Sequence, residues 1–278
     1  GELSPLCPAG GGDAALQEGF CLNALRAQFG SRLLIMLFTT QHLMKGFATS
    51  LTGPSVSFIY KAYRVPGPQA QIFGGVTMLP WAMKPVIGLV SDAFPIFGYH
   101  KAPYMLLSTV AGIFACATVG VTPQDHLRIQ CVVACLFMMQ MQFSTCDLLA
   151  EAKYAEKMKS KPQYGPMLMT YVWFGLNAGG LAATALVGPM MAHFGIRSPF
   201  LAALIPMSLV IVPLLRNFME ETPRSPEQQA EFRAQLMEQK AACFLCLLMF
   251  ASTIVLTVLG IVFDSAAINA VGAICVAT

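Results

Sequence analysis

Seven long apolar runs divide this sequence, and they restrict its fold more than any other feature. They cover residues 33–52, 70–90, 104–121, 129–150, 166–192, 200–215 and 241–263. The hydrocarbon core of a bilayer is about 30 Å thick, so a helix needs about 20 apolar residues to cross it. Barrel strands would instead alternate in hydrophobicity over segments of about ten residues. The sequence therefore predicts an all-α polytopic membrane protein.

The composition agrees with a membrane location and excludes several classes of protein. Only 11% of the 278 residues are charged and 56% are hydrophobic, whereas a soluble domain carries roughly 25% charged residues. A soluble enzyme, a disordered chain and a basic nucleic-acid binder are therefore excluded. No G-x-S-x-G, H-E-x-x-H or P-loop motif is present, so we expect no enzyme, no cofactor and no metal site. Cys243 and Cys246 lie in an apolar run, and we interpret them as small apolar side chains.

The polar segments between the runs suggest a division of the chain. We expect a cytoplasmic N-terminal segment over residues 1–32 and a six-helix bundle over residues 33–215. A polar cytoplasmic loop with a short surface helix would follow over residues 216–240, and the start of a second bundle over residues 241–278. The uncharged residues 265–278 would reach only about 21 Å as a helix. We interpret them as the first part of an eighth span, so the chain would hold six spans plus about one and a half more.

The placement of Lys and Arg predicts the orientation. With the N-terminus in the cytoplasm, eleven of them fall on the inner side, in residues 26–32, 101, 153–161 and 216–240. The four on the outer side are Lys61, Arg64, Arg128 and Arg197. Since short cytoplasmic loops carry the excess of positive charge, the N-terminus is predicted to be cytoplasmic.

Lys45 and Lys84 stand inside apolar runs, where a lysine costs about 2.5–3.5 kcal/mol on insertion scales. Lys45 lies in the outer half of the first run, three residues after His42, so the two are expected to share a helix face. Two interpretations of Lys45 stay open. Its ammonium either extends toward the outer headgroups or faces a cavity and attracts an anionic substrate.

Lys84 has an evident candidate partner in Asp147, which lies near the cytoplasmic end of the fourth run. The pair is either structural or is broken by a proton or a substrate. Pro80 and Pro85 flank Lys84 and Trp81, and each proline removes a helix hydrogen bond and favours a kink. The kinked segment would form a cavity wall, or else it reflects the ordinary frequency of proline in membrane helices.

The fifth run is rich in small residues. Gly175, Gly179 and Ala183 follow one another at intervals of four, which places them on one helix face. Such a face lets two helices approach closely in lipid, so we expect it to pack against a neighbouring helix.

Two stretches resemble one transporter family. Residues 81–104 read WAMKPVIGLVSDAFPIFGYHKAPY and residues 147–157 read DLLAEAKYAEK. They resemble the folate–biopterin transporter family of the major facilitator superfamily, and most of all its trypanosomatid branch. The matching positions are Trp81, Lys84, Pro85, Gly88, Ser91, Asp92, Pro95, Gly98, Tyr99, Lys101, Pro103, Tyr104, Asp147, Glu151 and Glu156.

The resemblance implies a multi-pass carrier, in the plasma membrane, of folate, biopterin or a related pteridine. It also implies alternating access, proton coupling and a major-facilitator-type bundle whose two halves hold six spans each, with lipid and a small molecule, and no nucleic acid, as partners. The residues that it suggests for substrate binding are Lys45, Trp81, Lys84 and Asp147. Those that it suggests for gating are Asp92, Lys101 and Glu151.

Two other functions stay open at this point. His100 and Lys101 stand where family members often carry an arginine-rich pair, and the chain holds little more than the first half of a carrier. It could therefore be a truncated membrane protein that transports nothing. It could also belong to a carrier of another organic anion in the same superfamily.

Overall fold

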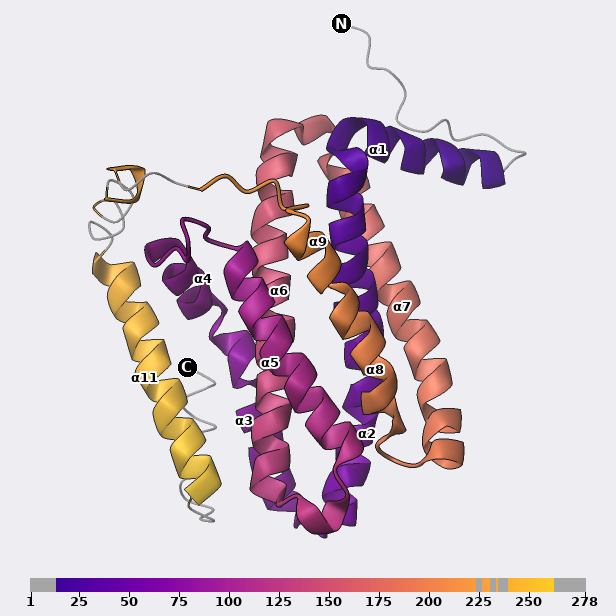
Figure 1. Cartoon of the computed structure of the whole chain (residues 1–278), viewed down its shortest axis with the longest axis vertical. Coiled ribbons are helices and arrows are strands. Elements are labelled where there is room, and N and C mark those ends of the chain that lie inside the picture. The colour runs from indigo at the N-terminus through magenta and orange to yellow at the C-terminus, as the bar shows by residue number, and fades with distance from the viewer. Residues whose placement is uncertain (1–13, 224–226, 231–233, 235–239, 263–278) are drawn as a thin grey trace, which may run out of the picture.

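A computed structural model describes residues 14–223, 227–230, 234 and 240–262. Every regular element in this part of the chain is a helix, and most of the helices run along one direction as a bundle (Figure 1). The elements are α1 (Ala14–Leu37), η1 (Phe38–Ala48), α2 (Thr49–Ala62), α3 (Gly67–Ala82), α4 (Lys84–Ala93), α5 (Ala102–Val121), η2 (Gln124–His126), α6 (Ile129–Ser160), η3 (Pro162–Tyr164), α7 (Gly165–Phe194), α8 (Ser198–Leu209), α9 (Ile211–Leu215) and α11 (Lys240–Val262).

Five helical stretches of the described residues are long and apolar enough to cross a membrane. They are Gly67–Ala93, Ala102–Val121, Ile129–Ser160, Pro162–Phe194 and Ser198–Leu215. These contain the second to sixth predicted spans, so the prediction of an all-α polytopic membrane protein is confirmed.

The first and last predicted spans differ from the other five. Residues 33–52 are helical, but they are not among the five apolar stretches, because Thr39, Gln41, His42 and Lys45 make this segment more polar. The seventh run lies in α11, which packs beside α3 and α4 and carries no charged residue between Ala241 and Val262. The predicted eighth span lies outside the described residues.

Backbone breaks shape the first two spans. Within α1, Gly30 has φ 80° and ψ 152°, a conformation that glycine adopts far more readily than other residues. The helix before it lies across the end of the bundle, and the helix after it enters the bundle (Figure 1). The second span breaks at Met83, between α3 and α4. Pro80 lies inside α3 and Pro85 in the first turn of α4, so the predicted kink is confirmed.

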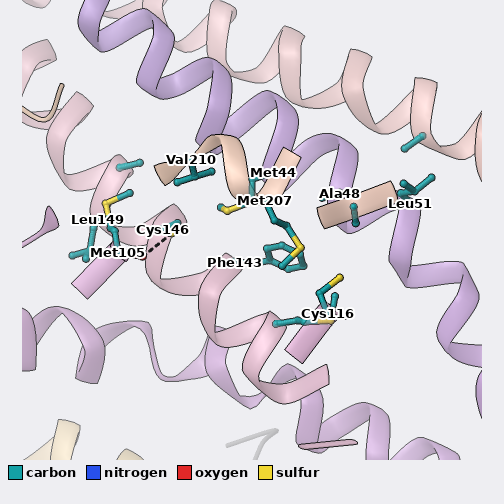
Figure 2. Packing of buried hydrophobic residues seen from close by; sticks show 14 of the residues in the cluster. Met44, Ala48, Leu51, Met105, Cys116, Phe143, Cys146, Leu149, Met207 and Val210 are labelled. Carbon is teal, nitrogen blue, oxygen red and sulfur yellow. Dashed lines mark hydrogen bonds between the residues drawn. The ribbon is translucent and has the colours of Figure 1, made fainter. Parts of the chain in front are cut away.

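The core fills the space between η1, α5, α6 and α8. Met44, Met105, Phe143 and Met207 are fully buried there; Figure 2 shows Met44, Phe143 and Met207 grouped together and Met105 near Leu149 and Cys146. Methionine is flexible enough to fill irregular gaps between helices. This apolar packing fixes the positions of η1 and α6, the two elements that supply most of the polar side chains described next.

The small face of α7 packs directly on η1, as the sequence predicts. A Cβ atom added at Gly175 would lie 2.1 Å from Cε1 of His42, and one at Gly179 would lie 2.7 Å from the His42 carbonyl oxygen. On the other side, a Cβ at Gly46 would lie 2.5 Å from the Leu176 oxygen. These glycines are therefore needed because the two backbones lie in contact.

Candidate functional site

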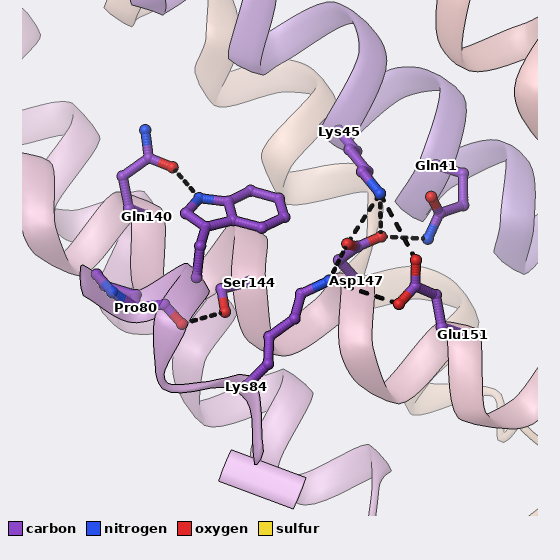
Figure 3. Close-up of polar contacts among 9 residues, drawn as sticks. Gln41, Lys45, Pro80, Lys84, Gln140, Ser144, Asp147 and Glu151 are labelled. Carbon is purple, nitrogen blue, oxygen red and sulfur yellow. Dashed lines mark hydrogen bonds and ion pairs between the residues drawn. The ribbon is translucent and has the colours of Figure 1, made fainter. Parts of the chain in front are cut away.

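A charged cluster of Lys45, Lys84, Asp147 and Glu151 joins three segments of the chain (Figure 3). The Lys45 Nζ lies 2.8 Å from each carboxylate oxygen of Asp147. The Lys84 Nζ lies 2.7 Å from Oδ2 of the same residue. The predicted pairing of Lys84 with Asp147 is thus present in the structure, and Lys45, from another helix, bonds the same carboxylate.

The two carboxylates of the charged cluster differ in burial. Asp147 is fully buried, and besides the two ammonium groups it accepts a hydrogen bond of 3.0 Å from Nε2 of Gln41. Glu151 is 38% exposed and lies 3.7 Å from Lys45 Nζ and 3.5 Å from Lys84 Nζ. A buried carboxylate needs such partners, because an unpaired charge in a medium of low dielectric is costly.

Trp81 forms an aromatic wall beside the two ammonium groups. The Nζ atoms of Lys84 and Lys45 lie 5.0 Å and 5.8 Å from the centre of the indole ring, within the range of a cation–π interaction. The indole Nε1 donates a hydrogen bond of 2.8 Å to Gln140. This bond fixes the ring plane, so the cluster combines positive charge with an oriented aromatic surface.

Helix α6 carries four polar side chains of the site on one face. Gln140, Ser144, Asp147 and Glu151 follow at intervals of four, three and four, the periodicity of one helical face. Ser144 donates a hydrogen bond of 2.6 Å to the carbonyl of Pro80 next to the break in the second span. The stripe therefore binds the kinked segment to α6 and aligns the polar groups in one row.

The π-helix η1 presents Gln41 and Lys45 to α6. Both side chains reach Asp147, while the ring of His42 packs against Tyr171 and Gly175 of α7. The prediction that His42 and Lys45 share a face is therefore wrong. It assumed α-helical spacing, in which positions three apart lie on one side, whereas the wider turns of a π-helix separate them, and such turns are frequent at functional sites.

The charged cluster lies deep within the bundle. At one end, Lys161 donates to the carbonyl of Gln28, and at the other, Tyr63 donates a bond of 2.6 Å to the carbonyl of Leu127. At 1.5 Å per residue, Asp147 is about 21 Å from the first end and about 30 Å from the second. The alternative in which Lys45 extends to the headgroups is not what the structure shows, since its ammonium points to Asp147.

The other two predicted gating residues make no contact with this cluster, and no ion pair or hydrogen bond joins their side chains in the described part of the chain. Lys101 pairs with Glu156, with 3.6 Å between Nζ and Oε2. The carboxylate of Asp92 makes no hydrogen bond or ion pair within the part of the chain that the structure describes, although its backbone carbonyl accepts a bond of 3.2 Å from Gln229. The structure thus does not pair Asp92 with Lys101, although their neighbours Ser91 and His100 are in contact.

The segment after α9 fastens this same end of the bundle. The carboxylate of Glu221 accepts hydrogen bonds from the backbone N–H groups of His100, Lys101 and Ala102 at 2.6 to 3.2 Å, where α5 begins and its dipole favours an anion. Next to it, Glu220 pairs with Lys157 at 2.7 Å. The hydrogen bond from Lys157 lowers the pKa of Glu220 below its ordinary value.

Several residues of the site were missed by sequence analysis. Gln41, Gln140 and Ser144 lie inside apolar runs, and their spacing from Lys45 and Asp147 was a usable signal. Glu221 gave no such signal, because its partners are backbone groups 119 to 121 positions away. Among the described residues, no group of His, Cys, Asp and Glu is arranged to hold a metal ion.

Known proteins resemble the chain over the region that carries this site. Residues 45–275 match the sequence model of the BT1 family. The chain belongs to the BT1 family. The match begins at Lys45 and includes Lys84, Asp147 and Glu151, so all four members of the charged cluster lie in the part of the chain that BT1 proteins share. No solved structure matches the chain.

Curated relatives of this BT1 chain carry transporter names. The "Probable folate-biopterin transporter 4" of Arabidopsis thaliana is 26% identical over 212 residues, which are 76% of this chain and 42% of that protein. The "Folate-biopterin transporter" of Synechocystis is 27% identical over 188 residues, 63% of this chain and 36% of that protein. The "Folate transporter 1" of Plasmodium falciparum is 32% identical over 78 residues, 28% of this chain and 15% of that protein. The chain thus spans less than half the length of these relatives.

Proposed function

We propose that the chain is part of a membrane carrier that moves folate, biopterin or a related pteridine. The observation that carries the proposal is the placement of two partly exposed ammonium groups, those of Lys45 and Lys84, beside the Trp81 ring and deep within the bundle. Ionisable groups inside a membrane protein are costly and mark substrate or ion pathways. Membership of the BT1 family and the names of the relatives support the same function.

The chemistry of the charged cluster suits a pteridine that carries a carboxylate. Ammonium groups bind carboxylates through charge-assisted hydrogen bonds, and an indole stacks on a flat heterocycle. In this proposal, Lys45 and Lys84 bind the glutamate tail of folate and Trp81 binds the pterin ring. Asp147 already accepts bonds from three donors, so it serves the substrate by holding both ammonium groups in place.

Alternating access would operate through the end of the bundle that holds Lys101. We place this end in the cytoplasm of a plasma-membrane protein, because the excess of Lys and Arg lies there. The ion pair of Lys101 with Glu156 and the hydrogen bonds that Glu221 accepts at the start of α5 hold this end in one arrangement. Asp92 would acquire a partner in the other arrangement. Glu151, exposed beside both lysines, would respond to substrate and protons.

Uptake measurements test the proposal. Cells expressing the complete polypeptide that contains this chain should accumulate labelled folate or biopterin saturably, and the rate should rise as the external pH falls. Replacing Lys84 by Ala, with surface expression unchanged, should abolish folate uptake. A labelled nucleoside and a labelled simple dicarboxylate are tested in the same way, as substrates of different chemistry. Absence of saturable folate and biopterin uptake would overturn the proposed function, and uptake of the dicarboxylate instead would favour another organic-anion carrier.

A further inference from the structure

The two carboxylates of the charged cluster are held with different strength. Asp147 is fully buried and bonded by Gln41, Lys45 and Lys84 at 2.7 to 3.0 Å. Glu151 contacts the two lysines at 3.5 and 3.7 Å and exposes 38% of its side chain. Charge-assisted hydrogen bonds are strongest below about 2.9 Å. Glu151 is therefore the outer, weakly bound counter-ion of the pair of ammonium groups.

The charge balance of the cluster restricts how an anion can bind there. Two ammonium groups face two carboxylates, so the cluster is neutral when all four groups are ionised. A third carboxylate would leave one negative charge in excess in a region of low dielectric, which is unfavourable. An arriving anion therefore requires one resident carboxylate to give up its place or its charge.

Asp147 is poorly suited to be the group that changes. If it were protonated, one of its oxygens would become a hydroxyl, and at least one of its three donors would lose an acceptor inside the bundle. Glu151 bonds the same two lysines from the exposed side, so its carboxylate can turn away without leaving a buried donor unpaired.

We propose that Glu151 is an exchangeable counter-ion. A substrate carboxylate takes its place between Lys45 and Lys84, and Glu151 binds one proton from water as it leaves them. The only covalent change is the new O–H bond on Glu151, whose proton comes from the solvent. The titratable groups that face Glu151 in the described part of the chain are Lys45 from η1, Lys84 from α4, and Asp147 and Tyr154 from its own helix. This inference rests on the proposed function, since it assigns the site of proton coupling within it.

The tryptophan content of the chain supplies a direct assay. Trp81 and Trp173 are the two tryptophans, and Trp173 is half-exposed on α7. Replacing Trp173 by Phe leaves Trp81, beside both lysines, as the single reporter. Folate and biopterin each absorb near the emission of tryptophan, so binding quenches the fluorescence of the purified chain in detergent. Folate carries carboxylates and biopterin carries none.

The proposal predicts a specific dependence on pH. Between pH 5.5 and 7.5 the carboxylates of folate stay ionised, since such groups have pKa values of about 4.3. Because one proton binds with each folate, the Kd for folate rises about tenfold for each unit by which the pH increases. Glu151→Gln should abolish this slope and tighten folate binding at pH 7.5 at least tenfold. Biopterin binding should be independent of pH in both proteins. Glu227→Gln changes an exposed carboxylate outside the charged cluster. It should leave the pH dependence of the folate Kd the same as in the Trp173→Phe protein, which is the parent of these variants.

Each outcome has one meaning. A Glu151→Gln protein that melts at the parent temperature but binds folate more weakly, or keeps the slope, overturns the exchange. A parent protein that binds folate with no dependence on pH overturns it as well. If the parent binds neither folate nor biopterin at any pH, the inference fails, and the proposed function fails with it when the complete polypeptide also takes up neither compound. Binding of both ligands by the parent therefore separates the two failures.

Discussion

Asp147 and Lys84 come from α6 and α4, 63 positions apart in the chain, and meet with 2.7 Å between Oδ2 and Nζ. The same carboxylate bonds Lys45 of η1. One fully buried side chain therefore fixes three helical segments relative to one another at the depth where the chain is proposed to bind its substrate. This relationship can be tested by removing the charge of Asp147 and then restoring the neutrality of the cluster with a second substitution at Lys84.

Replacing Asp147 by Asn should destabilise the protein strongly. The change leaves two lysines, each about one-fifth exposed, with only the weaker contact to Glu151. Breaking a buried ion pair costs about 3–5 kcal/mol, and we expect about 3 kcal/mol here because the lysines retain some access to solvent. A thiol-reactive dye that labels the buried Cys116 and Cys146 on unfolding measures the loss as a lower melting temperature.

A second substitution distinguishes lost charge from lost packing. Adding Lys84→Met to Asp147→Asn leaves Lys45 opposite Glu151, so the cluster is neutral again. We expect the double variant to recover at least half of the lost stability, because methionine fills the space of the lysine stem. A double variant as unstable as Asp147→Asn would show that the charge balance is not what stabilises this region.

Gly175→Ala should loosen the contact between α7 and η1. The new Cβ would lie 2.1 Å from Cε1 of His42, so ring or backbone must move, at a cost of about 1–3 kcal/mol. Gly188→Ala in the same helix meets nothing within 4 Å, and it should be neutral or stabilising by up to about 1 kcal/mol. Thermal unfolding in detergent compares the two. Equal melting temperatures would contradict the close packing.

The features that could be predicted from the sequence are those that depend only on residues close together in the chain. Runs of apolar residues determine the second to sixth spans, because crossing a bilayer is a requirement on each segment alone. The pairing of Lys84 with Asp147 was also predictable, since a buried charge needs a partner and few candidates exist. These conclusions need only the composition of short windows.

Other features depend on geometry that no short window contains. In the π-helix η1, His42 packs against Tyr171 of α7 while Lys45 reaches Asp147 of α6, a divergence that α-helical spacing does not predict. Glu221 binds backbone N–H groups of a distant helix start, and any residue can supply such groups. A carboxylate in a polar loop therefore gives no indication of its partner until the chain is folded.

Glu221→Gln should weaken the contact between the segment after α9 and the start of α5. The carboxylate accepts bonds from three consecutive N–H groups, and neutralising such a group at a helix start costs about 0.5–2 kcal/mol. Limited proteolysis should then cut residues 216–223 faster, by a factor of about three or more. Glu227→Gln is the matched control, and cutting at equal rates in both variants would refute the role of Glu221.

The pair of Glu220 and Lys157 should give stability that depends on pH. The hydrogen bond from Lys157 lowers the pKa of Glu220 below 4.5, so the folded protein favours the ionised carboxyl. The stabilisation is therefore fully present above about pH 4.5 and is lost as the pH falls through the lowered pKa. Because Glu220 is 46% exposed, solvent screens the pair and the effect is small. Glu220→Gln should lower the melting temperature slightly at pH 7 and not at pH 3, and 0.5 M NaCl should reduce the difference at pH 7. A difference that persists at pH 3 would assign the effect to packing and not to the ion pair.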